Sequence, residues 1–127
     1  MAESSKIGTI GWIDLTVKDG EGVRDFYQKV VGWESTPVEM GDYNDYCMLP
    51  PGLEEPVAGV CHAQGANANV PPQWLIYIFV ADLAASLIQV QSLGGKIIEG
   101  PKGQPSNPFA IIQDPAGAYC VLCQQPS

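Results

Sequence analysis

The sequence predicts an α+β domain made of two tandem copies of one βαβββ unit, and three observations support this prediction. First, an alternating, β-branched run at residues 8–18 is followed by an aspartate, a helical stripe of apolar residues and a glycine. Second, the same order returns in the second half of the chain. Third, the two copies share one offset, since Asp82 follows Asp19 by 63 positions and Gly95 follows Gly32 by the same number. Strand, cap, helix and terminator therefore recur in phase, as in an internal repeat.

The first copy is expected to place a helix between Asp19, an N-cap residue, and Gly32, a helix terminator. Short strands are expected at 34–40, 46–49 and 57–63, because turn-forming residues separate these runs. The apolar positions of the helix have the spacing of one face, and they are Val23, Phe26, Tyr27, Val30 and Val31.

The second copy begins after a polar, proline-containing linker at residues 64–73. We expect one domain over 1–127, with module one at about 7–63 and module two at about 74–125. Its predicted elements are a strand at 74–81, a helix capped by Asp82 and ended by Gly94-Gly95, a strand from 96–99, a loop at 101–108, and strands at 109–113 and 118–124 joined by the turn at 114–117. Its helical stripe comprises Leu83, Leu87, Val90 and Leu93.

The composition of the chain limits its possible binding partners and its cellular compartment. Six Lys and Arg against 14 Asp and Glu give a net charge of −8, without any basic cluster, so we expect no nucleic-acid and no membrane partner. We also expect no signal peptide and no membrane span, and hence a cytoplasmic protein. The four cysteines fall within apolar segments, which favours a reducing compartment; they are Cys47, Cys61, Cys120 and Cys123.

Three segments carry a resemblance to a known family: GWIDLTVKDGEGVRDFYQKVVGWE at 11–34, WLIYIFVADLAASLIQVQSLGGKII at 74–98 and FAIIQDPAGAYCVL at 109–122. They resemble the vicinal-oxygen-chelate superfamily of glyoxalases, bleomycin resistance proteins and extradiol dioxygenases, and more narrowly its subgroup with a GW-type first strand. The resemblance implies a curved, cup-like mixed sheet with helices outside, a small-molecule ligand in the cup, and a homodimer.

Catalytic members of this superfamily hold a divalent metal with His, Gln or Glu from the first and last strand of each module. The matching positions here are Trp12, Leu75 and Val121, with a fourth near Pro56 or Ala58. None of these side chains donates to a metal. The resemblance therefore implies no divalent metal and no other cofactor.

Residues with the same parity as a ligand position are expected to line the cup, because strand side chains alternate between faces. This expectation places Ala58, Val60 and His62 of the fourth strand inside, together with Leu75, Val121 and Cys123. We predict ligand contacts from Trp12, Asp14, Thr16, His62, Tyr77, Phe79 and Tyr119. Two alternatives stay open: His62 is a structural residue, and Asp14 is hydrogen-bonded to a neighbour such as Tyr77 or His62.

The sequence favours a metal-free protein that binds an aromatic or apolar small molecule, as a sequestering, resistance-type or accessory protein. A second hypothesis is a lyase, isomerase or dioxygenase-type enzyme with an atypical site, which would use either Asp14 and His62 as acid and base or a non-standard set of metal ligands. A third is a non-catalytic module that supplies a dimer surface. The catalytic residues, if there are any, are not identified by the sequence.

Overall fold

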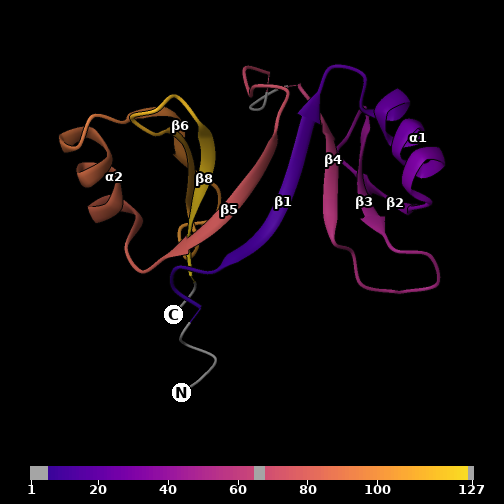
Figure 1. Ribbon diagram of the computed structural model, residues 1–127, viewed down its shortest axis with the longest axis horizontal. Coiled ribbons are helices and arrows are strands. Elements are labelled where there is room, and N and C mark those ends of the chain that lie inside the picture. Colours follow the sequence, from indigo (N-terminus) through magenta and orange to yellow (C-terminus); the bar gives the residue numbers. More distant parts are fainter. Residues whose placement is uncertain (1–5, 65–67, 126–127) are drawn as a thin grey trace. The chain divides into compact units, whose positions relative to one another are not determined.

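The computed structural model describes residues 6–64 and 68–125, so part of the expected linker lies outside the described residues (Figure 1). The chain divides into two compact units. The first unit is Ile13–Trp74, and the second unit consists of the residues up to Trp12 together with those from Leu75 onward. Strand β1 (Ile10–Val17) therefore begins in the second unit and continues in the first.

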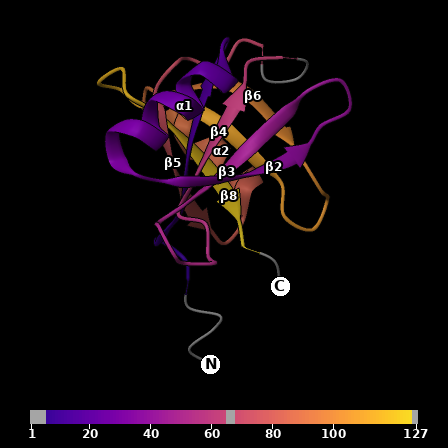
Figure 2. The ribbon, with the colours of Figure 1, turned by 90° about the vertical axis from the view of Figure 1, so that its right-hand side faces the viewer.

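The first unit contains a four-stranded mixed sheet with the order β2-β3-β4-β1 and one helix. Strand β2 pairs antiparallel with β3, β3 pairs antiparallel with β4, and β1 pairs parallel with β4. The helix lies against this sheet (Figure 2). The bounds are α1 Gly20–Val31, β2 Glu34–Glu39, β3 Asn44–Leu49 and β4 Ala58–His62.

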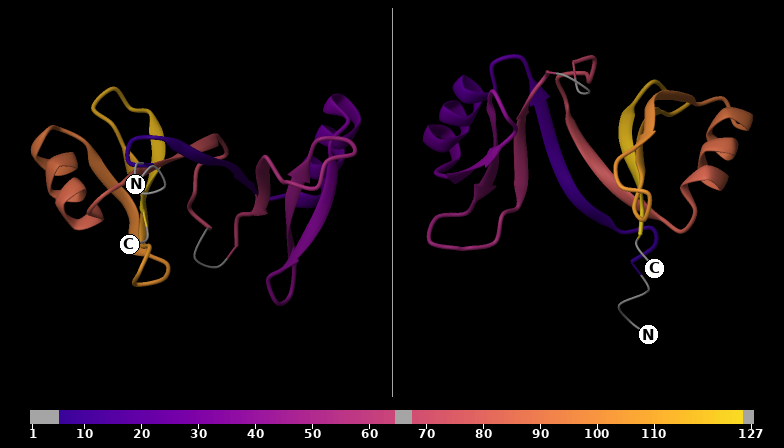
Figure 3. Two further views of the ribbon diagram at one scale, coloured as in Figure 1. Left: turned by 90° about the horizontal axis from the view of Figure 1, so that it is seen from below. Right: turned by 180° about the vertical axis from the view of Figure 1, so that it is seen from behind.

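The second unit repeats this arrangement with the order β5-β8-β7-β6, in which only the β5–β8 pairing is parallel. Helix α2 lies against one face of its sheet (Figure 3). The predicted α+β class with two βαβββ modules is thus confirmed. The bounds are β5 Trp74–Val80, α2 Leu83–Ser92, β6 Lys96–Lys102, β7 Phe109–Gln113 and β8 Tyr119–Gln124.

The helix starts follow the sequence prediction. The Asp19 carboxylate accepts a hydrogen bond from the Gly22 N–H at 2.9 Å, and that of Asp82 accepts one from the Ala85 N–H at 3.2 Å. Each bond satisfies one of the backbone donors that a helix leaves open in its first turn. Neither α1 nor α2, the two helices of the described chain, has the length and apolarity needed to cross a membrane.

The helix ends differ from the prediction in one respect. Gly32 takes the left-handed conformation after α1, with φ +87°, but after α2 that conformation belongs to Gly94 at φ +93°. Position 95 requires a glycine for a different reason, namely that there is no room for a side chain. A Cβ there would lie 2.8 Å from the Gln113 carbonyl oxygen. The exact 63-residue spacing therefore holds for the caps and fails for the terminators.

Each helix packs a narrower apolar stripe than the spacing predicts. In the first unit, Val23, Tyr27 and the post-helical Trp33 contact a buried cluster of Tyr46, Met48 and Val60. The remaining apolar positions of the predicted stripe stay exposed, and they are Phe26, Val30 and Val31. In the second unit the buried cluster is Leu83, Leu87, Ala110, Ile112 and Leu122, whereas Leu93 is 70% exposed.

The caps give a stability test. Asp82→Ala should lower the free energy of unfolding by about 1 kcal/mol, because the Ala85 N–H loses its acceptor at the start of α2. Urea unfolding measures this change. Asp82→Asn is the matched control, since an asparagine oxygen also accepts at this position; an equal loss in both variants would contradict the capping role.

Candidate functional site

Each sheet has one face that packs against its helix and one helix-free face, and the strand register assigns residues to them. In the second unit, Ile78 and Leu122 pair with each other and belong to the α2 core. The alternate positions lie on the helix-free face. Tyr77 pairs with Val121, which pairs with Ile111, and Phe79 pairs with Cys123, which pairs with Phe109.

We call the helix-free face of the second unit the aromatic face. Its floor is aliphatic and buried, with Leu75 at 2%, Val121 at 1% and Ile111 at 3% exposure. Four half-buried aromatic residues surround this floor: Tyr77, Phe79, Phe109 and Tyr119. Leu75, Tyr77, Phe79, Tyr119, Val121 and Cys123 thus share one face, as the sequence predicted.

Sequence reasoning missed Ile111 of the floor and three further contributors to this face. Phe109 lies with its ring centroid 6.5 Å from that of Tyr77, and Lys102 places its Nζ 5.7 Å from the Phe109 centroid. The same Nζ lies 3.7 Å from the Glu99 carboxylate. The pairing of Phe109 with Cys123 across the Asp114–Gly117 turn was the available signal, because cross-strand partners point to the same side.

Trp12 is half-buried and belongs to the second unit, where its neighbour Gly11 packs against the Phe79 ring. Any side chain at position 11 would collide with that ring. The glycine of the GW pair is therefore required by close packing.

The helix-free face of the first unit has a different chemistry. Asp14 pairs with Gly59, Cys47 also pairs with Gly59, and Thr16 pairs with Cys61. Asp14 and Thr16 therefore lie on one side, as the parity of β1 predicted, and the two cysteines, which the sequence did not place on this face, lie on the same side. Their role in ligand binding stays a prediction.

The parity assigned to β4 is wrong. Val60 belongs to the α1 core, and His62, two residues on, lies beneath the start of α1: a Cβ on Gly20 would lie 2.9 Å from the imidazole ring. Ala58, Val60 and His62 therefore lie on the helix side, opposite to Asp14 and Thr16. The error arose because the two positions considered for the fourth ligand, Pro56 and Ala58, are both even-numbered. The register instead places the odd-numbered Gly59 opposite Asp14.

His62 is surrounded by protein groups on this side. Its ring centroid lies 5.4 Å from that of Tyr43 and 6.1 Å from that of Tyr46, and its Nδ1 lies 3.7 Å from Asp45 Oδ1. The same Asp45 oxygen accepts the His62 backbone N–H at 2.8 Å. This arrangement supports the structural alternative for His62.

A family model for the glyoxalase/bleomycin resistance protein/dioxygenase superfamily matches residues 9–121. The chain belongs to this superfamily. "Putative glyoxylase CFP32" of Mycobacterium tuberculosis is 31% identical over 124 residues, which are 96% of this chain and 46% of the relative. "Anthracycline biosynthesis protein DnrV" of Streptomyces peucetius is 31% identical over 112 residues, which are 87% and 39%. The chain thus spans less than half the length of these curated relatives.

The fold of the superfamily is also seen in a solved structure. The crystal structure of methylmalonyl-CoA epimerase from Mycobacterium tuberculosis aligns with a TM-score of 0.55 at 16% identity, covering 97% of this chain and 91% of that one. At this identity the likeness concerns the fold alone.

The superfamily's metal position can now be tested against this chain. Asp14 pairs with Gly59 as Tyr77 pairs with Val121, so the first-unit counterpart of Val121 is Gly59, and neither Pro56 nor Ala58. The set at the superfamily's ligand positions is then Trp12, Gly59, Leu75 and Val121, and none of them offers a metal-binding side chain. These residues do not fit the divalent metal of the catalytic members. Within residues 6–64 and 68–125, no three His, Cys, Asp or Glu side chains are grouped to hold a metal ion.

Cys61 is the most shielded thiol of the helix-free face in the first unit. Burial raises its pKa far above the ordinary value, and the carboxylates of Asp14 and Asp45 raise it further. Because the thiolate is the reactive form, this cysteine is not suited to act as a nucleophile at neutral pH.

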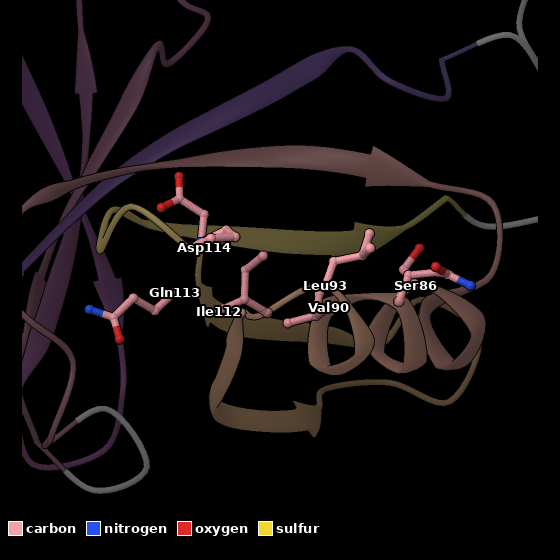
Figure 4. A pocket seen from close by; sticks show the side chains of 9 residues that line it. Ser86, Val90, Leu93, Ile112, Gln113 and Asp114 are labelled. Atoms are coloured by element: carbon pink, nitrogen blue, oxygen red, sulfur yellow. The ribbon is translucent and has the colours of Figure 1, made fainter.

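A pocket of about 350 Å³ lies on the helix side of the second unit (Figure 4). Val90 of α2 and Leu93 just after this helix line it from one side, and Ile112 with the turn that starts at Asp114 lines it from the other. The Asp114 carboxylate accepts the Ala116 and Ala118 N–H groups at 2.8 and 3.0 Å. Val90, which lines this pocket, follows Tyr27 by the offset of 63, and Tyr27 packs against the core cluster of the first unit.

The position of His62 can be tested through Gly20. Gly20→Ala should destabilise the protein by about 1 to 3 kcal/mol, because the new methyl group would overlap the imidazole ring. Without that overlap, alanine in a helix is more stable than glycine by up to about 1 kcal/mol. In a His62→Ala background the same change should therefore be neutral or stabilising.

Urea unfolding of the four proteins completes this double-mutant cycle. An equal cost of Gly20→Ala in both backgrounds would show that His62 does not lie beneath the helix start.

Proposed function

We propose that this chain binds a small, largely aromatic or apolar molecule on the aromatic face of the second unit, without the divalent metal of the catalytic superfamily members. The observation that supports this proposal is the set of four half-buried aromatic residues around a buried aliphatic floor. Ligand sites typically combine such apolar walls with a few polar groups that orient the ligand.

The polar groups available for orientation are few. Tyr77 and Tyr119 of the aromatic face carry hydroxyl groups, and Lys102 places a cation near Phe109. A planar ring with a hydroxyl or carbonyl substituent matches this combination. Its faces would stack on the aromatic rings, and its oxygen atoms would accept from the hydroxyl or ammonium donors.

The relatives suggest a first probe. The name of the Streptomyces peucetius relative refers to anthracycline biosynthesis, and anthracyclines contain fused planar rings with quinone and phenol oxygens. We therefore choose 1,4-dihydroxyanthraquinone, which has such rings and absorbs visible light.

Titration of the protein with 1,4-dihydroxyanthraquinone should give saturable binding. Phe109→Leu should weaken it by about two- to tenfold, because one aromatic pair contributes roughly 0.5 to 1.5 kcal/mol beyond the buried area. Absorbance of the quinone measures the dissociation constant.

Phe26→Leu is the matched control, since it makes the same change at a 55% exposed residue of α1 in the first unit. The control should bind as the parent does. Equal weakening in both variants, or unchanged binding after Phe109→Leu, would contradict the assignment of the site to the aromatic face.

A further inference from the structure

A second pocket, of about 370 Å³, lies in the first unit and is lined by Ile13, Trp33, Val57, Ala58 and Trp74. Ala58 pairs with Met48 of the α1 core, so this pocket belongs to the helix side of the sheet. It is therefore distinct from the helix-free faces described above. Its lining contains no charged side chain, and two of the five residues are tryptophans.

The two indoles are held in place by a third aromatic ring. The ring centroids of Trp33 and Trp74 lie 6.2 Å apart at 74°, and Tyr27 lies 5.8 Å from the first and 5.4 Å from the second. The Trp74 Nε1–H donates to the Tyr27 hydroxyl at 3.2 Å. This bond satisfies the polar atom of Trp74, so its indole meets the pocket mainly as an apolar and π surface.

The charge of the chain is concentrated on this unit. Residues 13–74 contain ten Asp and Glu against three Lys and Arg, a net of −7, whereas the rest of the chain has four against three, a net of −1. Three exposed carboxylates adjoin the pocket residues in sequence, since Glu34 follows Trp33, and Glu54 and Glu55 precede Val57. A field of this sign attracts cations, and an indole face binds a cation better than any other side-chain ring.

We propose that the pocket between Trp33 and Trp74 binds a small hydrophobic organic cation, an alkylated ammonium on an apolar or aromatic body. The apolar lining takes the body of the ligand, the indole faces attract the ammonium, and the carboxylates of the unit raise the local concentration of cations. A neutral molecule of the same shape gains only the first of these contributions.

The test uses two isosteric probes, 4-hydroxyphenyltrimethylammonium and 4-tert-butylphenol, titrated into the full chain by calorimetry in 0.15 M salt. The cation should bind at least about fivefold more tightly than the phenol, as a cation–π contact contributes roughly 1 kcal/mol or more. Its affinity should also fall as the salt concentration rises. In nitrogen-15 correlation spectra, the indole signals of Trp33 and Trp74 should shift on binding.

Val57→Lys places a positive charge at a lining residue that is 46% exposed, so the fold should tolerate it. This variant should lower the affinity for the cation by about fivefold or more, since like charges repel at short range. Its affinity for the phenol should stay within about twofold of that of the parent protein. Val38→Lys is the matched control, because it makes the same change at a residue of β2 that is 41% exposed and outside the pocket lining.

Thermal melting of both variants checks that they are folded. Equal affinity for the two probes, absence of saturable cation binding, or equal weakening by Val57→Lys and Val38→Lys would overturn the proposal. None of these results bears on quinone binding at the aromatic face, because that measurement uses a different probe and different variants.

Discussion

The parallel pairing of β1 with β4, and of β5 with β8, is the constraint on which the rest of each unit depends. A strand has only two faces, so the register of one pairing decides which residues meet the helix and which do not. Leu15 opposite Val60 and Ile78 opposite Leu122 place the apolar positions under α1 and α2. The candidate site residues are the ones left on the other face.

The same frame carries different chemistry in the two units. The helix-free face of the first unit carries Asp14, Thr16 and Cys61. That of the second unit carries Tyr77, Phe79 and Val121. On the helix side, Tyr27 and Trp33 pack against the core cluster of the first unit, whereas Val90, 63 positions after Tyr27, lines a pocket in the second. The repeat thus conserves the backbone while each unit has its own binding surfaces, so an assignment of function must be made unit by unit.

The fold was largely predictable from the sequence, because capping aspartates, turn residues and alternating strands are local signals. Asp19 and Asp82 cap the helices as predicted, and every predicted strand is present in the described chain. The faces of β1, β5 and β8 followed from parity. The face of β4 did not, because its register depends on a long-range pairing with β1 that the Pro-Gly turn leaves ambiguous in sequence. For the same reason His62 was assigned to the wrong side, and the fourth metal position was placed at Pro56 or Ala58 instead of Gly59. The homodimer, the cytoplasmic location and the GW-type subgroup stay predictions.

The central claim is that the aromatic face of the second unit is a ligand surface. The most direct test is a set of intermolecular nuclear Overhauser effects between bound 1,4-dihydroxyanthraquinone and methyl-labelled protein. The account predicts contacts from the quinone protons to the methyl groups of Ile111 and Val121, which form the floor of this face. Contacts to Val90 and Leu93 on the α2 side, without any to Ile111 or Val121, would contradict it.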